Sequence, residues 1–242
     1  MIKLLYFRKK ILFLFILVVG FTAISKPGLA YVIHDDGWDG PGQNSWSMSY
    51  YFGTMTPDLA PVDVKSTLVS ALSVWSSVVD ITFTETISAN QNNAIDFSFV
   101  TGNHGDGYPL NPGGALAHGF FPAPPNPETI GGDVHFNDNY LWEIGNSLGG
   151  SAFDLKWVAV HEIGHALGLN HSLNGSAVMF PTVSSSTVFS SLHADDIAGI
   201  QSIYATATAS AAVPEPGTIV LFGIGIFLVF GYGCRRRKLS TK

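Results

Sequence analysis

The sequence predicts an α+β fold in which several strands form a sheet and three helices pack beside it. Apolar and polar residues alternate over residues 46–52, 81–84 and 95–99, which is typical of half-buried strands. Apolar residues recur at three- and four-residue spacings over residues 62–78, which is typical of an amphipathic helix packed on a sheet. At 242 residues, the chain has room for one domain of ordinary size with an appendage at each end.

Residues 1–30 have the layout of a secretory signal peptide. Four basic side chains precede an apolar run over residues 11–24, and the small residues Gly28 and Ala30 follow on either side of Leu29. This order predicts export, with cleavage after Ala30. An uncleaved membrane anchor is the alternative.

Residues 213–242 form the other apolar end. Their apolar run over 218–232 precedes the basic cluster 235–238, and the run lies near the lower length limit for a membrane span. Because both basic ends should stay on the cytoplasmic side, we expect the domain between them outside the membrane. Residues 205–212 are small and polar and predict a linker, which leaves residues 31–204 as the folded domain.

The part of the chain between the two ends is strongly acidic. From residue 31 to residue 212, Lys65 and Lys156 stand against seventeen aspartate and glutamate residues, which excludes nucleic acid as a partner. The only cysteine is Cys234, so no disulfide forms within one chain. We expect an exported monomer that is stabilised by its core and by bound metals.

The remaining elements follow from local signals. Residues 35–45 are rich in Gly, Asp and Pro and predict a loop. Trp75 lies on the apolar face of the helix over 62–78, so we expect it in the core rather than in a binding site.

Two further helices are predicted downstream. Ser151, with an acid three residues later at Asp154, has the form of a capping box and predicts a helix over about 153–167. Residues 195–204 predict the final helix. It opens with two acids, which we expect to be structural, with one of them buried.

The stretch from His161 to His171 carries the clearest chemical signal. On a helix of about 3.6 residues per turn, His161 and His165 share one face and can bind one Zn²⁺. Glu162 points roughly 100° away around the helix, so it flanks the metal and is the expected general base. Gly168 lets the backbone turn and bring round His171 as third ligand. Three protein ligands leave one position open, as a hydrolytic zinc site requires, although the short His-Glu-x-x-His pattern also occurs on ordinary helices.

Other histidines suggest a second metal site. His104, Asp106, His118 and His135 offer three imidazoles and one carboxylate from loops and strand edges, which is enough for a four-coordinate structural zinc site. Spacing alone leaves open that each histidine is merely exposed in a loop.

The extended pattern from His161 to His171 is the signature of the metzincin metalloproteases, and residues 165–172 most resemble their matrixin branch. Three segments resemble the matrixin structural-zinc segments in the same order: residues 104–106, 116–118 and 131–136. The resemblance implies a metzincin/zincin-like fold: a twisted mixed sheet, two long helices and a short C-terminal subdomain with a final helix. It also implies two zinc ions and a Met-turn at Met179, a residue that would otherwise be read as core filler.

The implied activity is peptide-bond hydrolysis by a zinc-bound water, with Glu162 as general base and then as proton donor to the leaving amine. The exported chain would then be a zinc-dependent endopeptidase acting on proteins or peptides. The alternative is a non-catalytic extracellular-matrix or adhesion protein on a metalloprotease scaffold. The presence of Glu162 favours the enzyme.

The resemblance also implies how substrate is bound. An edge strand around residues 115–117, with Leu116 and Ala117, would pair with the extended substrate backbone. The specificity pocket would be lined by Trp157, Pro181 and Val183. Because an indole stands at the first position, we expect a shallow pocket that prefers small or medium apolar residues after the cut.

The calcium sites of matrixins carry over poorly. Asn111, Asn137 and Tyr140 stand where one site has acidic ligands, and hard cations prefer several carboxylates. Asp133 and the carbonyl of Gly131 match a second calcium site. Its third partner falls on Ala94, so calcium is not expected to bind strongly at either place.

The C-terminal order Pro-Glu-Pro, apolar run and Arg cluster resembles the PEP-CTERM sorting signal of Gram-negative bacteria. This implies transient anchoring in the inner membrane, processing by an exosortase-type enzyme, and delivery to the cell surface or an extracellular matrix.

Overall fold

The computed structural model describes residues 29–34, 36–40 and 42–207. The predictions made for residues 1–28 and for residues 208–242, including the signal peptide, the sorting segment and its apolar run, lie outside these ranges. Within them, no helix is both long enough and apolar enough to cross a membrane.

The centre of the fold is a five-stranded mixed sheet in the order β3-β2-β4-β6-β5. Its strands are β2 (Trp46–Phe52), β3 (Ile81–Glu85), β4 (Ala94–Val100), β5 (Ala117–Gly119) and β6 (Val134–Asn137). The first four in this order run parallel, and β5 runs antiparallel to β6 at the edge of the sheet. The three predicted strands and the mixed sheet are thus confirmed.

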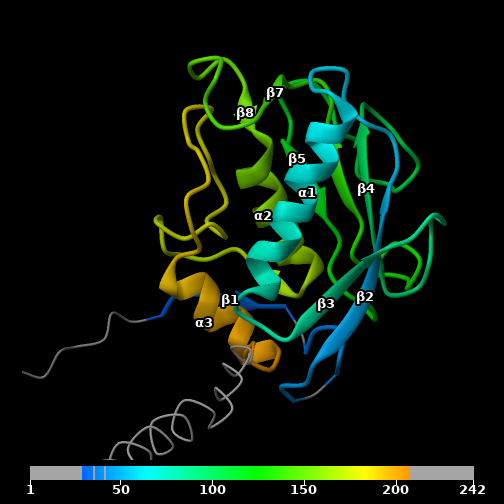
Figure 1. Cartoon of the computed structure of the whole chain (residues 1–242), viewed down its shortest axis with the longest axis vertical. Coiled ribbons are helices and arrows are strands. Elements are labelled where there is room, and N and C mark those ends of the chain that lie inside the picture. The colour runs from blue at the N-terminus through cyan, green and yellow to red at the C-terminus, as the bar shows by residue number, and fades with distance from the viewer. Residues whose placement is uncertain (1–28, 35, 41, 208–242) are drawn as a thin grey trace, which may run out of the picture.

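Two helices run side by side next to the sheet (Figure 1). Helix α1 (Pro61–Ser76) has proline in its first turn, where no backbone N–H is needed. Helix α2 (Leu155–Ala166) lies between α1 and β5 and contacts both. Trp75 joins the helices: its indole is fully buried and its N–H donates to the carbonyl of Val160 at 2.9 Å. The prediction that Trp75 is a core residue is confirmed.

The predicted start of α2 was wrong by two residues. Phe153–Asp154 form the short strand β8, which pairs with β7 (Trp142–Glu143), and Asp154 rather than Ser151 is the N-cap. The carboxylate of Asp154 accepts N–H groups from Gly145 and Phe189 as well as from Lys156. These contacts with distant segments override the local capping signal.

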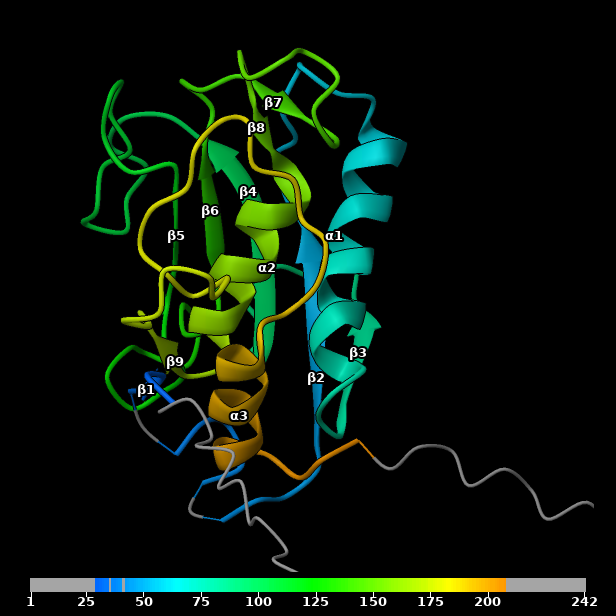
Figure 2. The ribbon, with the colours of Figure 1, turned by 90° about the vertical axis from the view of Figure 1, so that its left-hand side faces the viewer.

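A small C-terminal region lies below the end of α2 (Figure 2). It contains helix α3 (Ala194–Ile203), close to the predicted final helix, and the short pair of β1 (Val32–Ile33) with β9 (Leu169–Asn170). The predicted linker does not begin at 205 as a free segment. Asp80 N–H donates to Ala205 O, and Ala207 N–H donates to Val78 O, so the packed part of the chain extends to residue 207.

The Trp75 contact gives a stability prediction. Trp75→Phe should lower the free energy of unfolding by about 2 kcal/mol, because it removes both buried volume and the bond to Val160. Val62 is 70% exposed on the same helix, so Val62→Ala should change the free energy of unfolding by less than about 0.5 kcal/mol. Urea unfolding measures both, and equal changes would contradict the role given to Trp75.

Candidate metal centres

Helix α2 and the turn that follows it gather the first set of histidines. His161 and His165 lie one turn apart and are 6% and 7% exposed. Gly168 has a φ of 101°, a left-handed conformation that favours glycine, and the chain then turns back so that His171 joins them. The ligand atoms of the three histidines lie within 4.8 Å of one another.

The hydrogen bonds of these rings define which nitrogen is free. Nδ1–H of His161 donates to Val178 O, and Nδ1–H of His165 donates to Leu169 O, both at 2.7 Å. The two Nε2 atoms therefore present lone pairs to each other at 3.1 Å. Burial lowers the pKa of His161 to about 4 and that of His165 well below its usual range. Neutral imidazoles with converging lone pairs fit a cation such as zinc.

The segment that orients His161 is itself held by α3. Asp196 accepts N–H groups from both Val178 and Met179, at 2.9 and 3.0 Å. Met179 packs against the helix, because a Cβ at Gly164 would lie 2.4 Å from its sulfur. The adjacent Asp195 accepts the Ser172 hydroxyl. Both acids are 1% exposed, whereas the sequence analysis expected only one of them to be buried.

Glu162 lines the same cleft and is 7% exposed. Burial raises the pKa of its carboxyl to about 8, while a hydrogen bond from the Gly119 N–H works in the opposite direction. A divalent cation nearby would also favour the carboxylate. The backbone of β5 thus reaches the expected general base, a contact that the sequence pattern did not indicate.

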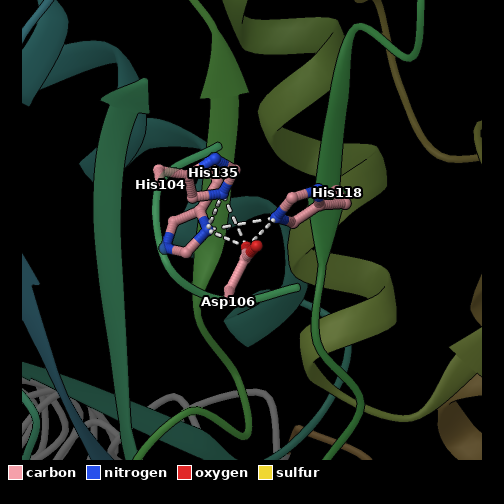
Figure 3. Close-up of side chains that lie close together, drawn as sticks. All are labelled: His104, Asp106, His118 and His135. Carbon is pink, nitrogen blue, oxygen red and sulfur yellow. Dashed lines mark hydrogen bonds and ion pairs between the residues drawn. The ribbon is translucent and has the colours of Figure 1, made fainter. Parts of the chain in front are cut away.

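The second cluster is assembled from a loop and two strands (Figure 3). Oδ2 of Asp106 lies 2.6 Å from His104 Nε2, 2.8 Å from His118 Nε2 and 3.0 Å from His135 Nδ1. His118 and His135 face each other across the β5–β6 pair. The structure therefore brings together all four residues that the sequence proposed for a structural zinc.

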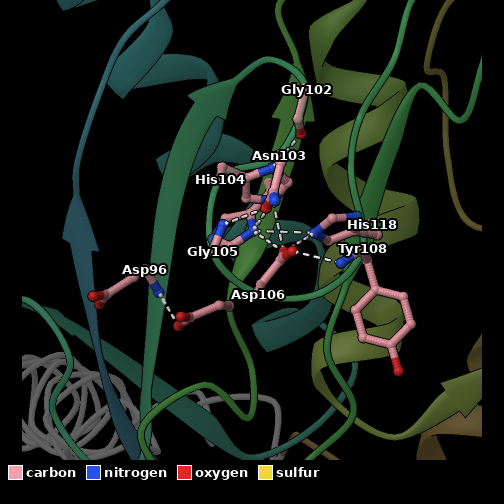
Figure 4. A network of polar contacts seen from close by, with 10 residues as sticks. Asp96, Gly102, Asn103, His104, Gly105, Asp106, Tyr108 and His118 are labelled. Atoms are coloured by element: carbon pink, nitrogen blue, oxygen red, sulfur yellow. Dashed lines mark hydrogen bonds and ion pairs between the residues drawn. The ribbon is translucent and has the colours of Figure 1, made fainter.

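The surroundings of Asp106 favour its charged form (Figure 4). Burial alone would raise its pKa, but the N–H of Tyr108 and the neighbouring imidazoles of His135, His118 and His104 outweigh burial, so the pKa is lowered. Burial lowers the pKa of His118 to about 4. One carboxylate beside three imidazoles is a donor set that fits zinc.

Side chains at the positions that lack the acidic calcium ligands make hydrogen bonds within the protein instead. The amide of Asn137 donates to the carbonyls of Asn111 and Ala115, at 3.0 and 2.8 Å. Tyr140 donates its hydroxyl to Gly114 O at 2.7 Å. At the other place, Asp133 accepts the N–H of Asp96.

A cleft of about 520 Å³ runs along α2 and the free edge of β5. It contains all the residues expected to bind substrate, as well as the first metal cluster and Glu162; the expected substrate-binding residues are Leu116, Ala117, Trp157, Pro181 and Val183. The ring of Trp157 stacks on His161, with centroids 5.5 Å apart. The expected edge strand begins later than predicted, because β5 covers residues 117–119 rather than 115–117.

Sequence reasoning missed the contacts made by the N-terminal segment. Trp38 donates its indole N–H to Ala166 O at the end of α2, at 2.8 Å. His34 stacks on Phe121, and Phe121 lines the cleft. No local pattern indicates these pairs, because the partners are far apart in the chain.

Comparisons with known proteins agree with this geometry. The family model for Matrixin matches residues 42–205, and the model for the PEP-CTERM protein-sorting motif matches residues 212–238. Matrix metalloproteinase-20 of Homo sapiens is 39% identical over 169 residues, 68% of this chain and 33% of that protein. Stromelysin-1 of Mus musculus is 42% identical over 70% of this chain and 35% of that protein. Interstitial collagenase of Bos taurus is 40% identical over 68% of this chain and 34% of that protein.

The two clusters give a prediction of metal content. The purified full chain should hold two zinc ions, and His104→Ala should hold one, because the second cluster loses a donor. His34→Ala removes a histidine outside both clusters and should keep two. Atomic emission after desalting measures the number of zinc ions per chain. A single zinc ion in the unaltered chain would refute the second site.

Proposed function

The chain belongs to the matrixin family, and from this premise we propose that it is an exported zinc-dependent endopeptidase. It spans about a third of the length of the curated relatives that it matches, so the activity of the whole relatives is carried over only as part of this proposal. The observation that carries this proposal is the cleft in which the ligand nitrogens of three histidines converge beside the buried carboxyl of Glu162.

Zinc held by His161, His165 and His171 would activate water and polarise the scissile carbonyl. Glu162 stands beside these ligands and takes the proton from the attacking water. It then delivers that proton to the leaving amine. The bond from the Gly119 N–H orients its carboxylate within the cleft. Burial keeps bulk water away from this proton transfer.

The free edge of β5 supports binding of an extended peptide. Its outer side has no strand partner in the described sheet. Apart from the Gly119 N–H, which bonds to Glu162, the backbone groups on this side are available for strand addition. Trp157, Pro181 and Val183 line the cleft, and Trp157 stacks on His161; in this proposal they select a small or medium apolar residue after the cut. The side chain after the cut would thus contact the indole of Trp157.

The PEP-CTERM motif supports the proposed setting. The exported domain is anchored through its C-terminal segment before an exosortase-type enzyme processes it, and it acts as a monomer at the cell surface or in the extracellular matrix of a Gram-negative bacterium. The acidic charge of the domain suits a site outside the membrane and away from nucleic acid. The proposed protein holds two zinc ions, one catalytic and one structural, and no tightly bound calcium.

The general base gives the direct test. Glu162→Gln should lower kcat for casein or peptide cleavage about a thousand-fold while the zinc content stays the same, because the amide cannot accept the proton. Glu128 is exposed and bonds only to Asn92 in the described contacts, so Glu128→Gln serves as the matched control. Unchanged cleavage by Glu162→Gln would refute the assignment of Glu162 as the general base. A zinc-loaded but inactive unaltered chain would favour the non-catalytic matrix or adhesion protein.

The pocket wall gives a separate test of specificity. Trp157→Leu should shift the preferred residue after the cut towards longer side chains, because the smaller side chain deepens the pocket. Leu173 is 83% exposed and does not line the cleft, so Leu173→Ala should leave the profile unchanged. A peptide library cleaved by each variant reports this preference. A profile dominated by long side chains in the unaltered protein would contradict the shallow pocket.

A further inference from the structure

The loop that follows the third histidine of the first cluster contains a chemically reactive pair of residues. Asn174 is followed by Gly175, and this is the only Asn-Gly pair in the whole sequence. The backbone nitrogen of a residue after asparagine can attack the side-chain amide carbon and close a small, unstrained ring. Because glycine has no side chain, nothing hinders that attack. The pair is therefore a candidate for loss of the side-chain amide.

The local geometry favours the attack. Among the hydrogen bonds of the described residues, the N–H of Gly175 donates to none. This glycine is exposed, and a Cβ added to it would meet no heavy atom within 4 Å. The side-chain oxygen of Asn174 accepts the N–H of Ser176 at 3.0 Å, and this donor would stabilise the negative charge that forms on the oxygen during attack. The amide carbon is thus polarised while the attacking nitrogen stays free.

The side-chain nitrogen of Asn174 connects this loop to α3. It lies 3.4 Å from Nδ1 of His193, the N-cap of α3. The same Nδ1 accepts the N–H of Asp195 at 3.1 Å, so it presents a lone pair and the amide of Asn174 is the donor. A carboxylate at residue 174 would face this lone pair without a proton to share. Deamidation would therefore replace an attraction by a repulsion at the start of α3.

The start of α3 also supports the first metal cluster. Asp195 accepts the hydroxyl of Ser172, the residue directly after the third histidine ligand. Asp196 accepts the N–H of Val178, and the carbonyl of Val178 accepts Nδ1–H of His161. A shift of the N-terminal turn of α3 would thus reach the orientation of the metal ligands.

We propose that Asn174 is a site of spontaneous deamidation and that its conversion weakens zinc binding at the first cluster. The nitrogen of Gly175 forms a bond to the side-chain carbon of Asn174, the amide nitrogen leaves as ammonia with the proton from Gly175, and a cyclic imide remains. Water then opens one of the two C–N bonds of the imide that involve this nitrogen. The products are aspartate, or isoaspartate with the main chain rerouted through the side chain.

Both products carry a new negative charge, and isoaspartate also lengthens the main chain by one carbon. The longer chain would break the turn that the Ala177 N–H closes onto the carbonyl of Asn174 at 3.0 Å. The reaction requires only water, so it does not depend on peptidase activity. Its effect on zinc rests on the proposed function, in which the first cluster holds the catalytic ion.

Peptide mapping of the ageing full chain by mass spectrometry tests the site. The zinc-loaded Glu162→Gln chain is kept in mildly alkaline buffer, because this variant does not digest itself in the proposed function. Asn146 is the internal control: it is exposed, its side-chain oxygen accepts the Gly150 N–H at 2.9 Å, and a serine follows it. Asn174 should convert about ten-fold faster than Asn146, because glycine leaves the attacking nitrogen unhindered.

Gly175→Ala is the matched variant for this measurement. The φ of Gly175 does not lie in the left-handed region, and the added methyl group has free space, so alanine fits without strain. Its methyl group hinders the attacking nitrogen. The conversion of Asn174 should therefore fall to about the rate of Asn146 while the fold stays the same.

Asn174→Asp reproduces the aspartate product without ageing and tests the consequence. In the His104→Ala chain, where only the first cluster should keep zinc, competition with a chelator measures the affinity of that cluster. Adding Asn174→Asp should lower this affinity about ten-fold, the order found when groups that orient metal ligands are changed. Asn146→Asp adds the same charge at a residue that does not line the cleft, and it should leave the affinity unchanged.

Equal conversion of Asn174 and Asn146, or conversion that Gly175→Ala does not slow, overturns the modification site. An affinity for zinc that is the same in Asn174→Asp and in the parent chain overturns its consequence. Rapid conversion of Asn174 in a protein whose unaltered form cleaves nothing would support the modification site while refuting the peptidase.

Discussion

The hydrogen bonds from Nδ1 of His161 and His165 to backbone carbonyls are the constraint on which the first metal cluster depends. They fix the tautomer of each ring and turn both Nε2 atoms towards one point. The two carbonyls come from different segments. Val178 is held by Asp196 of α3, and Leu169 pairs with Ile33 of β1. The helix that carries the histidines therefore depends on both ends of the folded chain for their orientation.

The two metal clusters meet at β5. His118 belongs to the second cluster, and the next residue, Gly119, contacts the helix of the first. A Cβ at Gly119 would lie 2.4 Å from the backbone oxygen of Glu162, closer than side chains tolerate. Because β5 is an edge strand of three residues paired only with β6, the cross-strand pair of His118 and His135 gives it much of its anchorage. A metal at the second cluster would thus also hold the proposed substrate-binding edge in place.

Sequence patterns predicted the candidate metal-binding residues better than the tertiary contacts that hold them in place. The helical spacing of His161 and His165 needs no tertiary information, and neither does the alternation in β2 or β4. The capping signal at Ser151 failed because the carboxylate of Asp154 is engaged by Gly145 and Phe189, which are brought near only by the fold. The stack of His34 on Phe121 could not be predicted from the sequence for the same reason. Contacts between distant residues, rather than local propensity, decide these positions.

The departures from the matrixin calcium pattern show how a polar loop is stabilised by other means. A cation would be coordinated by carbonyl oxygens together with carboxylates. Here the two amide protons of Asn137 meet the carbonyls of Asn111 and Ala115, and Tyr140 meets that of Gly114. The neutral amide and hydroxyl groups thus donate hydrogen bonds to these carbonyl oxygens without adding charge. These hydrogen bonds tie the loop that leads into β5 to Asn137 at the end of β6 and to Tyr140 just after it.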